Sequence, residues 1–166
     1  PGDNELVVRV INPPIDETLE GWRAGAPLNQ SDLPIGKAAW YFNFGGIWQD
    51  VNLLVTAKAY VQDCFVEPLV RKKQARANLI LVHAGRSGDY EVVCRVTPKS
   101  DPLKAVAETS VTTKLKKGEN DLSAMLSFDQ VHLWSDRDPF LYTMTVELRH
   151  KGEPVDAHAV TFGMRE

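Results

Sequence analysis

The chain alternates apolar and polar residues over short segments, a period of two that is typical of β-strands with one buried face. Turn residues such as glycine and proline separate these segments at intervals of about 8–12 residues, the pattern of an immunoglobulin-like β-sandwich. No segment shows sustained helical periodicity, so the sequence predicts an all-β fold. The predicted strands are Tyr60–Glu67, Ala75–His83, Tyr90–Thr97, Val106–Leu115, Asp121–Phe128, Phe140–Arg149 and Val155–Phe162.

The first 56 residues are organised differently. Strand candidates lie at Glu5–Asn12, Trp40–Phe44 and Ile47–Thr56, and the segment Ile15–Ala39 between them has no periodicity and is interrupted by glycine and proline. A few strands with a long loop cannot form a stable sheet alone. The sequence therefore predicts an incomplete β piece, residues 1–56, joined to a complete sandwich, residues 57–166. One hypothesis is that the unpaired strands of the first piece find hydrogen-bonded neighbours in a homodimer.

Composition narrows the functional classes. Hydrophobic residues make up 43% and charged residues 25% of the chain, ordinary values for a globular domain, and the formal net charge is −3. This balance argues against a nucleic-acid or anionic-membrane partner, which a clustered excess of cations would indicate. The basic cluster Arg71–Lys73, with Arg76 close behind, is interpreted as a solvated turn between two strands. Turns are also predicted at Gly118–Asn120 and at Lys151-Gly152.

The cysteines and histidines do not predict a metal or cofactor site. Cys64 and Cys94 lie in apolar alternating segments and are expected to be buried free thiols, although a bridge between them stays open at this point. The histidines lack metal-ligand spacing. We expect His132 to be half-buried beside Trp134, and three histidines to lie at exposed strand ends or faces: His83, His150 and His158.

Four sequence motifs follow one another along the chain. They are Gly2–Val10, Trp40–Thr56, Leu133–Thr143 (Leu-Trp-Ser followed by Asp-Pro-Phe-Leu-Tyr-Thr) and Phe162–Glu166. Together, and in this order, they resemble glycoside hydrolase family 2. In that family the first two belong to a jelly-roll sugar-binding domain, the third to an immunoglobulin-like domain, and the last to the point where this domain joins the catalytic barrel. A basic residue that is usual in the second motif is replaced by Gln49, which leaves the subfamily open.

The resemblance implies a non-catalytic portion of a larger enzyme. It assigns residues 1–56 to the end of the jelly-roll and residues 57–166 to the immunoglobulin-like domain, which would orient the sugar-binding domain against a TIM barrel of the same parent chain. A TIM barrel needs about 250 residues, and the family's acid motifs are absent from this sequence, so no catalytic residue is assigned. The parent is expected to hydrolyse O-glycosidic bonds of β-galactoside or β-glucuronide type, and to be secreted or periplasmic.

The aromatic residues near the N-terminus leave two other functions open. Trp22, Trp40, Tyr41, Phe42, Phe44 and Trp48 lie close together in sequence, and most are expected to pack in a core. A carbohydrate-binding module would instead use this aromatic cluster as a platform for sugar. The residues expected to contact sugar, in such a module or in the parent enzyme, are Trp22, Arg23, Tyr41 and Asn43. A protein-interaction module would show an exposed apolar patch or a free strand edge.

In the sandwich, Trp134 and Tyr142 are expected in the core, with Tyr142 bonded back to a turn as corner tyrosines are. Asp136 and Asp138 are expected in a solvated turn.

Overall fold

The computed structural model describes residues 5–10, 47 and 49–165 of the chain. By their contacts the residues divide into two compact units, Pro1–Leu53 and Leu54–Glu166. Among the described residues, only those of the second unit form strands. Within the same part of the chain, no helix is long and apolar enough to cross a lipid bilayer.

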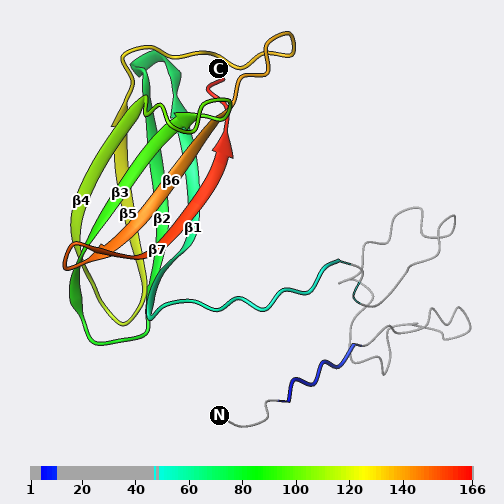
Figure 1. The fold of residues 1–166 in the computed structure, drawn as a ribbon, viewed down its shortest axis with the longest axis vertical. Helices are drawn as coiled ribbons and strands as arrows, with labels where there is room; N and C mark the ends of the chain where they lie inside the picture. Colours follow the sequence, from blue (N-terminus) through cyan, green and yellow to red (C-terminus); the bar gives the residue numbers. More distant parts are fainter. Residues whose placement is uncertain (1–4, 11–46, 48, 166) are drawn as a thin grey trace, which may run out of the picture. The chain divides into compact units, whose positions relative to one another are not determined.

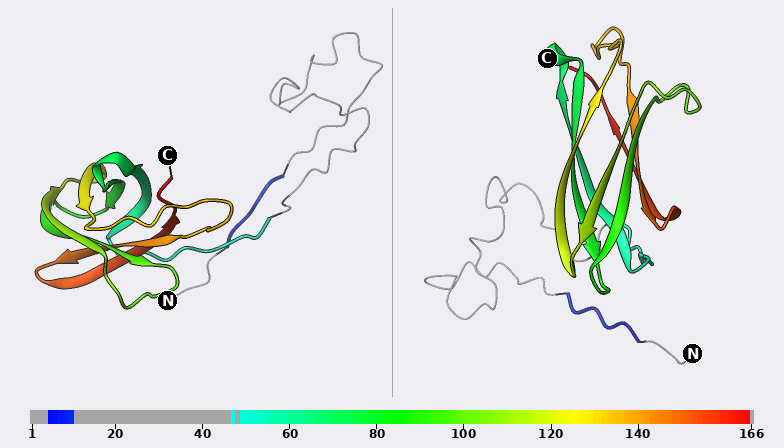
Figure 2. Two further views of the ribbon diagram at one scale, coloured as in Figure 1. Left: turned by 90° about the horizontal axis from the view of Figure 1, so that it is seen from above. Right: turned by 90° about the vertical axis from the view of Figure 1, so that its left-hand side faces the viewer.

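The second unit is an antiparallel β-sandwich of two sheets (Figures 1 and 2). One sheet has the strand order β1-β2-β5 and the other β4-β3-β6-β7. This architecture confirms the predicted all-β class, and each of the seven strands predicted between residues 57 and 166 forms close to its expected bounds. The elements are β1 (Ala59–Leu69), the 3₁₀ turn η2 (Val70–Lys72), β2 (Gln74–His83), β3 (Gly88–Pro98), β4 (Ala107–Leu115), β5 (Gly118–Ser127), β6 (Tyr142–His150) and β7 (Glu153–Phe162).

The alternation of the sequence builds the core. In β2 every second residue from Ala75 to His83 is buried, and in β6 the same is true from Tyr142 to Leu148. Burying a Leu, Val or Met side chain stabilises the fold by roughly 1.5–3 kcal/mol each. The largest fully buried side chains come from both sheets and from the segment after β7, and are Leu81, Leu115, Leu126, Met144, Leu148, Met164, Val92, Val96, Val146 and Cys94.

A carboxylate closes the side of the sandwich where β1 borders β7. The pairing of β1 with β2 shifts register between Val61 and Asp63, which marks a β-bulge in an edge strand. The backbone N–H of Val61 donates to Asp156 Oδ2 of β7 at 2.8 Å. A side chain of one sheet thus satisfies a part-buried backbone donor of the other, and it ties the two edges together.

Replacing Asp156 with alanine should lower the free energy of unfolding by about 1–2 kcal/mol, because the part-buried N–H of Val61 loses its acceptor. Asp156→Asn keeps one amide oxygen at the same place, so it should retain most of the stability. Urea denaturation of the two variants beside the wild type measures the difference. An alanine variant as stable as the wild type would show that the bulge does not depend on this contact.

The hairpin turn between β6 and β7 uses the left-handed backbone region, and so does Gly118 in the connection from β4 to β5, which crosses between the two sheets. Lys151 and Gly152, between β6 and β7, have φ values of 55° and 86°, as a two-residue type I′ turn requires. The turn predicted at this position is confirmed. The turn predicted at Gly118–Asn120 is placed too far along the sequence, because these residues already form the start of β5. The side chain of Asn120 reaches back across the connection and bonds the backbone N–H of Lys116 at 2.8 Å and its carbonyl at 2.9 Å.

The chain reaches the sandwich at one end and leaves it at the other. Successive strands run in alternate directions, so an odd number of them carries the chain from the lower to the upper end in Figure 1. At the lower end Ala84 N–H donates to the Lys58 carbonyl at 2.7 Å, which fixes the approach to β1. At the upper end, residues 163–165 follow β7.

Two strands predicted in the first 56 residues do not form where the structure describes them. Residues 5–10 and 49–56 have no strand assignment, and their aliphatic side chains are exposed. A β-strand needs a hydrogen-bonded neighbour, and an alternating segment without one has no ladder. The candidate Trp40–Phe44 lies outside the described residues. The assignment of residues 1–56 to a jelly-roll stays a prediction.

Candidate functional site

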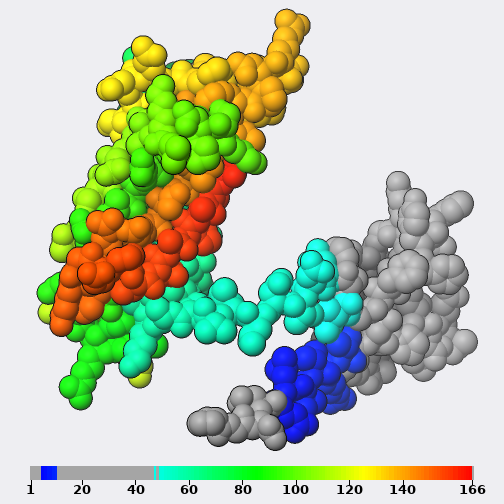
Figure 3. Space-filling model, in the orientation of Figure 1, coloured from blue at the N-terminus to red at the C-terminus, as the bar shows by residue number. Residues whose placement is uncertain are grey.

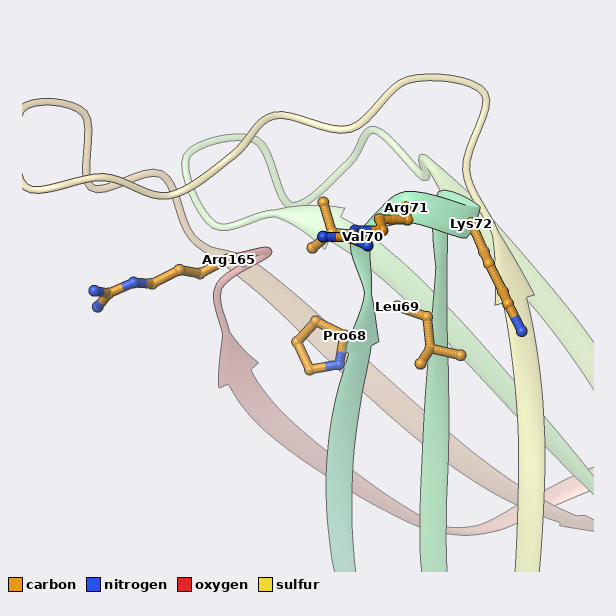
Figure 4. Close-up of a pocket in the computed structure, with 6 residues that line it drawn as sticks. All are labelled: Pro68, Leu69, Val70, Arg71, Lys72 and Arg165. Carbon is orange, nitrogen blue, oxygen red and sulfur yellow. The ribbon is translucent and has the colours of Figure 1, made fainter.

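In the part of the chain that the structure describes, hollows lie at the end of the sandwich where β7 ends. One, of about 360 Å³, is shown in Figure 4 and is lined by residues of β1, of η2 and of the C-terminal segment. Two others, of about 410 and 440 Å³, border the loop that connects β5 to β6 (residues 128–141, gold in Figure 3). The first is lined by Pro68, Leu69, Val70, Arg71, Lys72 and Arg165.

The first hollow is lined by both apolar and basic residues. Pro68, Leu69 and Val70 are apolar, and the basic residues come from η2 and, as Arg165, from the C-terminal segment. In Figure 4 the side chains of Arg165 and Lys72 extend in opposite directions, away from Pro68. The 3₁₀ turn ends at Lys73, which has a φ of 50° and whose carbonyl accepts the N–H of Phe128 at 2.9 Å. Arg71–Lys73 therefore form an exposed turn between strands, as predicted, and part of this turn borders the hollow. Arg76 instead lies inside β2 and pairs with Glu67.

The C-terminal segment is held against the β5–β6 loop. Trp134 N–H donates to the Met164 carbonyl at 2.8 Å, and the Arg165 guanidinium lies 4.9 Å from the centroid of the Trp134 ring. A Cβ at Gly163 would lie 3.2 Å from Trp134 Cβ, so glycine allows this close approach. Trp134 is half-buried at the sandwich end, and the expectation of a core tryptophan is wrong.

Tyr142 fixes the other side of the same loop. Its ring is buried and its hydroxyl accepts the backbone N–H of His132 at 2.8 Å, ten residues back along the chain. The predicted hydrogen bond from this tyrosine to a preceding turn is confirmed. The ring lies 5.8 Å from Phe128, 5.0 Å from Phe140 and 5.6 Å from Phe162, centroid to centroid.

The loop also carries an exposed imidazole–carboxylate pair. His132 Nε2 lies 2.5 Å from Asp138 Oδ2, with the two side chains 48% and 61% exposed. The imidazole stacks on Phe140 at 4.0 Å instead of lying buried beside Trp134. Ser135 Oγ accepts the Asp138 N–H at 3.0 Å, so its bond is to backbone and not to the imidazole. The arrangement orders the turn that holds Asp136 and Asp138 and does not form a serine–histidine nucleophile pair.

The two cysteines face the core from opposite sheets. Cys64 of β1 and Cys94 of β3 are both buried and unbridged, as the alternation predicted. Burial raises the pKa of the Cys64 thiol to about 11, with a smaller contribution from Asp63. Burial also raises the pKa of the Cys94 thiol to about 12, with a smaller contribution from Cys64. Thiols with such pKa values hold almost no thiolate at neutral pH and are unreactive in the folded state.

A second histidine cluster lies at the opposite end of the sandwich. His83 is buried, contrary to the expectation of an exposed strand end, and its Nε2 lies 3.2 Å from Tyr90 Oη. The Tyr90 ring is 4.7 Å from that of His150. The Nδ1 atom of His83 is buried with no hydrogen-bond partner. Within the described residues, no three His, Cys, Asp or Glu side chains come together as a metal site.

The predicted sugar-contact residues cannot be placed in this geometry. Trp22, Arg23, Tyr41 and Asn43 all lie outside the described residues. The features that sequence reasoning missed are the hollow beside η2 and the stacking of Arg165 on Trp134. The terminal Phe-Gly-Met-Arg motif contained both Gly163 and Arg165, but only the structure shows that Trp134 packs against them.

The sequence profile of the glycosyl hydrolases family 2 matches residues 59–165 of the chain. The chain is 29% identical to a β-galactosidase large subunit of Leuconostoc lactis over 64% of its length and 16% of that protein. It is 28% identical to a β-glucuronidase of Bacteroides fragilis over 82% of its length and 21% of that protein. It thus spans about a fifth or less of these relatives.

Among solved structures, the β-D-mannosidase of Dictyoglomus thermophilum superposes with a TM-score of 0.62. That match is 26% identical and covers 72% of this chain and 15% of the mannosidase. The sandwich is therefore similar to a minor part of much longer hydrolases.

Proposed function

Because the chain belongs to the glycosyl hydrolases family 2, we propose that its sandwich is a non-catalytic spacer of a larger glycosidase. In this proposal it orients a sugar-binding domain, of which residues 1–56 are the end, against a catalytic barrel. The parent enzyme hydrolyses O-glycosidic bonds of β-galactoside or β-glucuronide type, the activities that the names of the two curated relatives carry.

The observation that carries the proposal is the position of the two chain connections at opposite ends of a rigid body. Strand β1 has 11 residues, which corresponds to a length of roughly 35 Å. The alternating strand directions place residues 54–58 at one end of this length and residues 163–165 at the other (Figure 1). A sandwich with this path holds the two flanking parts of a longer chain at a fixed separation.

The surface at the exit end supports the same role. Its hollows are lined by apolar side chains, including half-exposed Leu133, and by Arg165 of the departing segment. Three carboxylates of the sandwich make structural contacts: Glu67 with Arg76 at 2.9 Å, Asp138 with His132, and Asp156 with the Val61 N–H. A retaining glycosidase instead needs two carboxylates about 5–5.5 Å apart that face a substrate.

The proposal predicts that this chain alone cleaves none of a panel of aryl β-glycosides, whereas the longer parent cleaves at least one. The release of aryl alcohol by both proteins, assayed side by side, measures this. Turnover by the 166-residue chain would overturn the non-catalytic assignment, and a parent inactive on the whole panel would overturn the substrate class.

The orienting role has its own test in the parent. Replacing residues 59–165 with a flexible Gly/Ser linker of similar reach should lower kcat/KM at least about tenfold, because a flexible linker does not fix the relative position of the flanking parts. Exchanging the same residues for the corresponding sandwich of a family relative is the matched control and should keep most of the activity. Equal activity of the two chimeras would contradict a spacer function.

A further inference from the structure

Sheet pairing does not determine the direction in which residues 163–165 leave the sandwich. In the part of the chain that the structure describes, the pairing of β7 with β6 ends at Phe162, opposite Tyr142. The next residue is Gly163, and glycine has a freer backbone than any other residue. Contacts outside the sheet must therefore fix the path of this segment.

The core and Trp134 together hold the segment in place. The Met164 side chain is fully buried, and its carbonyl accepts the Trp134 N–H at 2.8 Å. A Cβ at Gly163 would lie 3.2 Å from Trp134 Cβ and 3.4 Å from the ring atoms Cγ and Cδ1, so the indole packs directly on the glycine backbone. The Arg165 guanidinium then lies 4.9 Å from the centroid of the same ring.

Trp134 is itself attached to the sandwich by its own loop. Two residues before it, the His132 N–H donates to the Tyr142 hydroxyl at 2.8 Å. Directly after it, the Ser135 N–H donates to the Asp138 carbonyl at 2.9 Å, and Ser135 Oγ accepts the Asp138 N–H at 3.0 Å. The indole is therefore a support that is fixed independently of the segment it contacts.

We propose that Trp134 is the positioning residue that fixes the direction in which the chain leaves the sandwich. This inference rests on the proposed function, in which the catalytic barrel follows the sandwich, and it names the side chain that sets the orientation of the barrel. Without the indole, a rotation of about 20° at Gly163 would move a point about 30 Å away by about 10 Å, whereas a misplacement of about 1 Å can already cost about a hundredfold in rate.

Hydrogen exchange in the 166-residue chain tests the contact itself. The reporter is the amide of residue 134, because its N–H is donated to the Met164 carbonyl. In Trp134→Ala the protection of this amide should fall at least about tenfold, since the segment that carries its acceptor is no longer held. Trp134→Phe retains an aromatic face and should keep most of the protection. Arg165→Ala, at an exposed position, removes only the stacked guanidinium and should have a smaller effect.

The amide of His132 is the internal control, because Tyr142 holds it in the same loop. Its protection should be the same in all three variants and in the wild type. A fall at both amides in Trp134→Ala would show that the indole holds the whole loop rather than the departing segment. Unchanged protection of amide 134 would show that the indole holds nothing. Either result would overturn the proposal.

Kinetics of the parent test the consequence. Trp134→Ala should raise KM at least about fivefold and leave kcat within about twofold, because the barrel keeps its chemistry but loses the binding contribution of a correctly placed sugar-binding domain. Trp134→Phe should restore most of the loss.

The Gly/Ser linker chimera separates failure of this inference from failure of the proposed function. An impaired chimera beside a Trp134→Ala parent with an unchanged KM would leave the spacer function standing and overturn the role of Trp134. A fully active chimera would overturn the spacer function and, with it, the orientation of the barrel by Trp134.

Discussion

Replacing Tyr142 with alanine is expected to lower the free energy of unfolding by roughly 3–5 kcal/mol, the range for losing a large buried aromatic side chain. The ring is 3% exposed and packs on three phenylalanines from the loop and from β7. The same change removes the acceptor for the His132 N–H. Thermal or urea unfolding followed by circular dichroism measures the loss, which approaches the whole stability of a typical domain.

Tyr142→Phe separates the two contributions. It keeps the ring packing and removes only the hydroxyl, so its cost should be about 1–2 kcal/mol, the penalty of a part-buried N–H left without an acceptor. Trp134 lies in the same loop and reports its order, because its ring packs against Gly163 and Arg165. The phenylalanine variant should therefore also change the fluorescence of Trp134. If both variants unfold like the wild type, the aromatic cluster does not hold this end of the sandwich.

Alkaline pH should destabilise the sandwich through its two buried thiols. Both folded pKa values are raised above the ordinary 9.0, to about 11 for Cys64 and about 12 for Cys94. The unfolded chain therefore loses these protons first, so the stabilisation is complete below pH 9 and is lost as pH rises from 9 toward 11–12. The expected loss is about 1 kcal/mol per thiol for each pH unit above 9.

The double variant Cys64→Ala/Cys94→Ala isolates the contribution of the two thiols to the pH dependence of stability. It should be less stable than the wild type at pH 8, because two buried side chains are shortened. Its stability should also fall less steeply above pH 9. Urea unfolding at pH 8 and pH 10.5 in the presence of a reductant gives both quantities. Parallel pH profiles for the two proteins would show that the thiols ionise without unfolding.

The strands of the sandwich could be predicted because apolar and polar residues alternate within each of them. In β2 the alternation Ala75, Ala77, Leu79, Leu81 fixes which face is buried, and a one-residue shift would expose all of them. The same parity places His83 on the buried face, so the sequence did contain the signal that contradicts an exposed histidine. For a residue inside a strand, position in the alternation decides burial more strongly than the polarity of the side chain.

Long-range packing outside the strands was not predictable. Trp134 lies in a loop without periodicity, and its position depends on Gly163, Met164 and Arg165, about thirty residues further along the chain. Residues 5–10 and 49–56, parts of two predicted N-terminal strands, form no strand for a different reason. An alternating segment specifies which side it would bury, but the neighbouring strand must be supplied from elsewhere. The candidate sugar-contact residues lie outside the described part of the chain and stay predictions.

The path of the chain through the sandwich also determines how the fold carries tension. Because the two connections leave from opposite ends, a force applied through them runs along the strands (Figure 1). Strand β1 is then pulled lengthwise against β2. The hydrogen bonds that join residues Ala59–Leu69 to β2 are therefore loaded together rather than broken one after another. Strands loaded in this shear direction resist extension better than a hairpin opened from one end, so the same topology would let the proposed spacer keep its length under load.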